Sequence, residues 1–130
     1  MENFIDTWND TNGIKSIFLR LKNFLATQKG ADLSFNARPG VSYSLRAAHP
    51  DHKDRSLYVI VDVVDDDPND RWMSVCFFGD MITDPEEKGE LIPGGLLGED
   101  GYCFDITKPD DKLAAYVEAR IEEAYHSEAG

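Results

Sequence analysis

The chain has 130 residues, with 25 Asp or Glu against 13 Lys or Arg, and therefore a formal net charge of -12. This length is close to the commonest domain size, so we expect a single domain over residues 1–130. The excess of acid argues against nucleic acid and against anionic membrane surfaces as partners, because both are bound mainly through cationic side chains.

Residues 1–12 are polar apart from a few apolar side chains spaced to share one face of a short helix. They are expected either to dock on the core or to form a loosely docked N-terminal arm. This start lacks the basic and apolar regions of a secretory signal, and no apolar run in the chain is long enough to span a bilayer. A cytoplasmic location is expected.

An amphipathic helix is predicted over residues 13–28, where apolar residues recur at the i, i+3, i+4, i+7 spacing of one helix face. Asn12 is its predicted N-cap, and Gly30 is predicted to end it. Apolar and polar residues then alternate over 33–38 and again over 41–47, on either side of a Pro-Gly pair. This pattern predicts a β-hairpin.

The central hairpin is predicted from residues 57–64 and 72–78, two runs rich in β-branched and aromatic residues. The loop between them carries Asp65, Asp66, Asp67 and Asp70, but their spacing does not match a calcium-binding loop. We therefore expect a solvated turn and no metal there.

The last third of the chain mixes turn signals with one further strand and one helix. Thr83 and Glu86 have the spacing of a capping box and predict a single helical turn at 84–88. A proline and four glycines in 90–101 predict a loop, and 101–106 is the predicted fifth strand. Thr107 and the residues after it are expected to open a final helix that runs to about Ser127.

The two cysteines, Cys76 and Cys103, both fall in predicted strands and lie in no CxxC spacing. Without an export signal we expect both to be buried, reduced and inert.

The predicted fold is an α+β two-layer sandwich, a five-stranded antiparallel sheet flanked by an N-terminal and a C-terminal helix that cover the same face. This order of elements resembles, in outline, the frataxin-type sandwich and the small secretion chaperones. No motif of either group occurs in the sequence, so the resemblance assigns a role to no residue.

The sheet face turned away from the helices is the main functional clue. Period-two alternation predicts that Asp62 lies on that face, because an unpaired carboxylate in the core is costly. Either the 90–100 loop or the N-terminal arm covers this face, or it is open and binds a partner, most simply a second copy. The candidate partner surface consists of Tyr58, Ile60, Trp72 and Phe78.

The leading functional hypothesis is therefore a non-enzymatic, chaperone-like adaptor or protein-interaction domain that needs no cofactor. The alternative is a small enzyme or a protein that binds a ligand or divalent metal, with an acidic pocket beside the 90–100 loop. The acids considered for that pocket are Asp62, Asp84, Glu99 and Asp105. His49 and His52 lie three residues apart, but in a predicted loop that would not hold them as a chelate.

Overall fold

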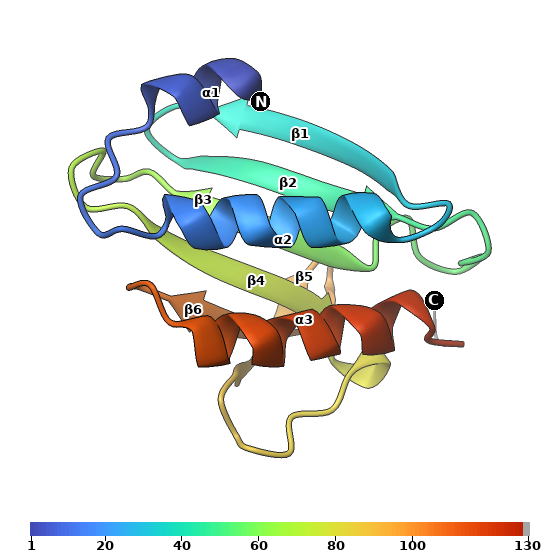
Figure 1. Cartoon of the computed structure of the whole chain (residues 1–130). Coiled ribbons are helices and arrows are strands. Elements are labelled where there is room, and N and C mark those ends of the chain that lie inside the picture. Colours follow the sequence, from blue (N-terminus) through green and yellow to red (C-terminus); the bar gives the residue numbers. More distant parts are fainter. Residues whose placement is uncertain (129–130) are drawn as a thin grey trace.

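The computed structural model describes residues 1–128 and shows an α+β fold in which helices cover one face of an antiparallel sheet (Figure 1). The strand order is β1-β2-β3-β4-β6-β5. The predicted class and the flanking helices are confirmed, but the sheet has six strands rather than five. The elements are α1 (Glu2–Thr7), α2 (Lys15–Thr27), β1 (Asp32–Arg38), β2 (Ser42–Ala48), β3 (Val59–Val64), β4 (Trp72–Phe78), the 3-10 turn η1 (Gly79–Met81), β5 (Glu90–Leu96), β6 (Glu99–Ile106) and α3 (Asp111–Tyr125).

The extra strand is β5, in the segment predicted to be a loop. It pairs with β6 at the edge of the sheet, with an irregularity between Ile92 and Leu96. Proline and glycine are tolerated in edge strands because one side of the backbone needs no partner, and Pro93 and Gly94 lie in this strand. The loop prediction failed because proline and glycine argue against a central strand but are compatible with an edge strand.

The core lies between the helices and one face of the sheet. On the central strand β3, Val59, Val61 and Val63 are at most 1% exposed, and they pack with the apolar stripes of α2 and α3. The helix α1 docks on the same side, since Phe4 stacks on Tyr43 with 3.8 Å between ring centroids. Of the two alternatives for residues 1–12, the structure therefore shows docking.

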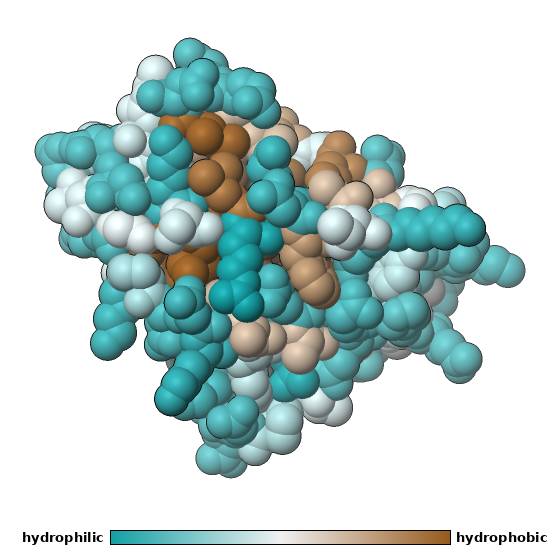
Figure 2. Space-filling view, viewed as in Figure 1, coloured by the Kyte–Doolittle hydropathy of each residue, from teal (hydrophilic) through white to brown (hydrophobic). Residues whose placement is uncertain are grey.

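Seen from the helix-bearing side, most of the surface is hydrophilic (Figure 2). The apolar atoms that reach it gather in the upper half of the view, around α1 and α2 (Figure 2). The helices thus leave some apolar surface uncovered towards the β1–β2 side of the sheet.

Both long helices begin differently from the sequence prediction. Asn12 does not cap α2, because its amide donates to Asp70 Oδ1 and to the carbonyl of Arg71, each at 2.8 Å. Asp10 accepts from the backbone amide of Lys15 instead, at 3.0 Å. At α3 the N-cap is Asp110, whose carboxylate accepts from the Leu113 amide at 3.0 Å. Capping acids shifted by a few residues satisfy the same free amides.

The capping box at Thr83 and Glu86 is not formed, and no helix occurs at 84–88. The Thr83 hydroxyl donates to Glu123 on α3 at 2.6 Å. Asp84 takes over the turn, accepting from the amides of Lys88 and Gly89, both at 2.9 Å. A tertiary partner on α3 therefore replaces the local helical turn.

Candidate interaction surface

The sheet face opposite the helices is built from rows of side chains that run across the strands. The central row has one residue from each of five strands, at paired positions: Asn36, Ser44, Asp62, Ser74 and Asp105. The helices pack on the other face, and no helix among residues 1–128 lies over these rows (Figure 1). We call the residues of this side the uncovered face.

The uncovered face holds Ile60, Trp72 and Phe78 by register, but not Tyr58. The Tyr58 side chain is fully buried on the helix side, and its hydroxyl donates to Gln28 Oε1 at 2.6 Å. Tyr58 precedes the first residue of β3, so the period-two alternation does not extend to it. The predicted placement of Tyr58 on the outer face was wrong.

Phe78 is not accessible either, because the loop before β3 covers it. The Arg55 guanidinium lies 4.3 Å from the centroid of the Phe78 ring. Hydrogen bonds to Asp80 and then Glu99 hold this cation in place and raise its pKa. Phe78 is 2% exposed and Ile60 is 7% exposed, so Trp72, which is half-buried, is the accessible aromatic group of the predicted set.

Trp72 lines a hollow of about 300 Å³ at one end of the uncovered face, together with Asp105. Burial raises the pKa of Asp105, and the nearby charge of Glu90 raises it further. Sequence reasoning did not pair these groups. Trp72 and Asp105 come together because β4 pairs with β6. The strand β5 comes between β4 and β6 in the chain, but in the sheet it lies at the edge, on the far side of β6. The other residues of the hollow are Asn12, Asp70 and Thr107.

Asp62 lies at the centre of the uncovered face, where it is partly removed from solvent. Burial raises the pKa of this carboxyl, while a hydrogen bond from Ser44 and the charges of Arg46 and Arg38 act in the opposite direction. Its Oδ1 atom is buried and has no hydrogen-bond partner among the described residues. The position of Asp62 on the face is as predicted, and its environment disfavours the charged form.

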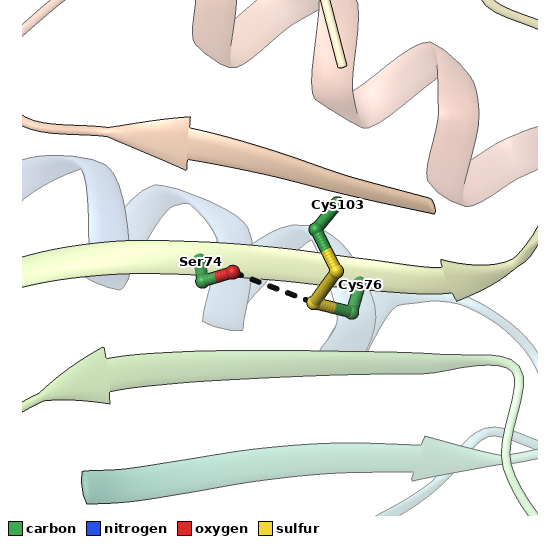
Figure 3. Close-up of a disulfide and its surroundings, with 3 residues drawn as sticks. All are labelled: Ser74, Cys76 and Cys103. Atoms are coloured by element: carbon green, nitrogen blue, oxygen red, sulfur yellow. Dashed lines mark hydrogen bonds between the residues drawn. A yellow bond between two sulfur atoms is a disulfide. The ribbon is translucent and has the colours of Figure 1, made fainter. Parts of the chain in front are cut away.

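The cysteines overturn the prediction of two buried, reduced thiols. Cys76 and Cys103 occupy paired positions on β4 and β6, 4.2 Å apart at Cα, and form a disulfide (Figure 3). Both are half-buried on the uncovered face, and the Ser74 hydroxyl lies 3.4 Å from the Cys76 sulfur. Only the pairing of β4 with β6 brings these residues together.

The acids of the predicted pocket are distributed over three environments. Burial raises the pKa of Asp84, but hydrogen bonds from Tyr116, from two backbone amides and from Tyr102 outweigh it and lower the pKa to about 2. Glu99 binds Arg55 at 2.8 Å. Asp62 and Asp105 lie on the uncovered face with β4 between them. The four carboxylates therefore do not converge on one pocket.

His49 and His52 lie close together in the loop between β2 and β3. The rings of His49 and His52 are stacked with 5.1 Å between centroids, and His52 Nε2 lies 3.1 Å from the carbonyl oxygen of Tyr125. Within residues 1–128, no group of three or more His, Cys, Asp or Glu side chains has a geometry that could hold a metal ion.

No protein-family model matches the chain, and neither the curated proteins nor the solved structures include a significant match. The outline resemblance in element order is thus supported by no comparison. None of the helices in residues 1–128 has the length and apolar character needed to cross a membrane.

Proposed function

We propose that the chain is a non-enzymatic protein-interaction domain whose uncovered face binds a partner through a Lys or Arg side chain seated beside Trp72. The observation that supports this most is the hollow that Trp72 and Asp105 both line. An aromatic residue and an acidic residue in one hollow favour a cation over an anion or an apolar group.

The chemistry of this hollow suits a basic side chain in two ways. A cation over an indole ring gains about 0.5–2 kcal/mol, and tryptophan is the best of the aromatic residues for this contact. A carboxylate adds a charge-assisted hydrogen bond, which is stronger than one between neutral groups. The net charge of -12 increases the rate at which a basic partner approaches.

The alternative hypothesis of an enzyme or metal-binding protein receives less support from the geometry. Asp84, whose pKa is lowered to about 2, already accepts four hydrogen bonds within the chain. Acid–base chemistry needs groups within reach of one substrate, and the acids of the predicted pocket lie apart. The cytoplasmic location expected from the sequence stays a prediction, and the Cys76–Cys103 disulfide counts against it because disulfides are rare in that compartment.

The proposal can be tested with a phage-displayed library of random peptides selected against the purified chain. Selected peptides are expected to share a Lys or Arg next to apolar residues, and their binding to weaken at least about tenfold in Trp72→Asp and in Asp105→Asn. Leu91→Asp is the matched control, because Leu91 is 51% exposed and lies outside the hollow. Its binding should stay unchanged.

Two results would contradict the proposal. One is a set of selected peptides without basic residues. The other is binding that Trp72→Asp leaves intact although the variant is folded by circular dichroism. Either result would remove the hollow at Trp72 from consideration as a binding site.

A further inference from the structure

The two edges of the sheet differ in how they are protected from pairing with another strand. The outer side of β1 pairs with no strand among residues 1–128, and β1 keeps an unbroken register with β2 over all seven of its residues. It contains no proline, lysine or bulge, three of the features that block an edge, and its charged residues are Asp32 and Arg38 at its two ends. The opposite edge strand, β5, carries Pro93, Gly94 and an irregular register.

The side chains of β1 also resemble half of an interface. Leu33 and Phe35 point to the helix side of the sheet but remain half-buried, because the sheet ends at this strand. The Phe35 ring lies 6.0 Å from that of Phe4 and 6.3 Å from that of Tyr43, between centroids. A further strand beside β1 would bury this apolar row.

The sequence of β1, Asp-Leu-Ser-Phe-Asn-Ala-Arg, is complementary to itself when two copies run antiparallel. With Phe35 at the centre, Asp32 of each copy lies opposite Arg38 of the other. Leu33 then lies opposite Ala37 on the helix side. We propose that β1 pairs antiparallel with β1 of a second copy about a two-fold axis at Phe35, and so joins the two sheets into one.

The register at Phe35 is specific. If the axis moves by one residue to Ser34, Asp32 lies opposite Asn36 and Arg38 falls beyond β1. Moving it the other way, to Asn36, places Arg38 opposite Ser34. Only the axis at Phe35 pairs all seven residues and forms an ion pair at both ends of the strand. Opposite charges at paired positions stabilise antiparallel strands, and like charges destabilise them.

A second copy fits the edge better than it fits the uncovered face. Two copies packed face to face would remove Asp62 and Asp105 of both from water, and the cations of that face, Arg38 and Arg46, already act on Asp62 within each copy. Pairing at the edge instead satisfies backbone groups and leaves the face accessible. Both Trp72 hollows would then lie on the same side of the joined sheet, because the axis is perpendicular to it.

The test is the solution mass by light scattering over a dilution series. The wild-type chain is expected to reach twice the 14.6 kDa of one chain. Asp32→Arg alone and Arg38→Asp alone place like charges opposite each other twice per dimer, so each should weaken the dissociation constant at least about tenfold. The double variant Asp32→Arg/Arg38→Asp restores opposite charges and should restore the dimer.

Two controls separate the edge from other surfaces. Asp66→Arg makes the same charge change in the exposed β3–β4 turn and should leave the mass unchanged. Trp72→Asp should also leave the mass unchanged, while it weakens peptide binding. A wild-type chain that stays monomeric overturns the edge pairing. The edge pairing is also overturned if Trp72→Asp breaks the dimer, or if the double variant fails to restore it. None of these outcomes depends on whether the hollow binds peptides.

Discussion

The carboxylate of Asp65 and the guanidinium of Arg71 form an ion pair across the base of the β3–β4 hairpin, with 2.6 Å between Oδ1 and Nε. Their side chains are 5% and 11% exposed. The other oxygen of Asp65 accepts from the backbone amide of Gly40 at 2.9 Å. One carboxylate thereby ties the turn of the β1–β2 hairpin to that of the central hairpin.

Asp65→Asn is expected to lower the free energy of unfolding by about 3–5 kcal/mol, because it leaves Arg71 buried without its counter-charge. Urea unfolding followed by circular dichroism measures this. Asp66→Asn, one residue further into the exposed turn, is the matched control and should change the stability little. Equal effects of the two variants would mean that the ion pair contributes nothing specific.

We expect Asp84 to contribute stability that is lost in acid. Its pKa is lowered from 3.8 in the unfolded chain to about 2 in the folded one. The folded state therefore binds this proton less readily, so the contribution is present above pH 3.8 and is lost as the pH falls towards 2.

At neutral pH, Asp84→Asn should cost about 1–3 kcal/mol, since hydrogen bonds from Tyr102 and Tyr116 lose a charged acceptor. Unfolding titrations at several pH values should show a shallower loss in acid for this variant than for Asp6→Asn, an exposed control. Parallel curves for the two variants would contradict the assigned role of Asp84.

For Asp62 we expect the opposite dependence of stability on pH. Its pKa is raised, so the folded chain holds this proton more tightly than the unfolded chain, and stability falls as the pH rises from the ordinary value through the raised one. Asp62→Asn removes the charge and should be more stable than the wild type at neutral pH and equal to it in acid. Thermal melts at two pH values check this, and a variant that is less stable at neutral pH would refute it.

The disulfide predicts a dependence of stability on reductant. Cys76 and Cys103 are 27 residues apart, and closing a loop of that size contributes roughly 3 kcal/mol. Dithiothreitol should lower the melting temperature of the wild type and leave that of Cys76→Ala/Cys103→Ala unchanged. Alkylation before and after reduction, read by mass spectrometry, counts the free thiols directly.

We expect a substitution of Tyr58 to change the stability of the fold but not the binding of peptides. Tyr58→Phe removes the hydrogen bond to Gln28 and should cost about 1 kcal/mol, because both groups are buried. Binding of the selected peptides should match the wild type, in contrast to Trp72→Asp. Weaker binding by folded Tyr58→Phe would show that the helix side takes part in recognition.

Much of the fold could be predicted because its signals are local. The apolar spacing of α2 and the alternation along β3 each follow from the period of one element, and both were recognised. The helix starts were mispredicted because several polar side chains near each start can accept the free amides. Asp110 caps α3, whereas Ile14 holds the N-cap position of α2 and Asp10 accepts from the Lys15 amide. The 90–101 segment was missed because Pro93 is compatible with an edge strand but looks like a break.

The candidate site was harder to predict because it depends on which strands are neighbours. The position of β6 beside β4 creates both the Cys76–Cys103 bond and the hollow of Trp72 and Asp105. Because β5 lies between β4 and β6 in the chain, the sequence gives no local sign that β4 and β6 pair. The misplacement of Tyr58 has a different cause: the alternation was extended to a residue that precedes the start of β3.

The unequal edges of the sheet also limit how far the chain can assemble. A protein with two open edges can add copies at both ends and grow into a fibre, because each addition presents a new edge. Here Pro93 removes one backbone donor from β5, and the irregular register next to it displaces others. An assembly through β1 would therefore end at two copies, and concentration would raise the fraction of dimer without starting polymer growth.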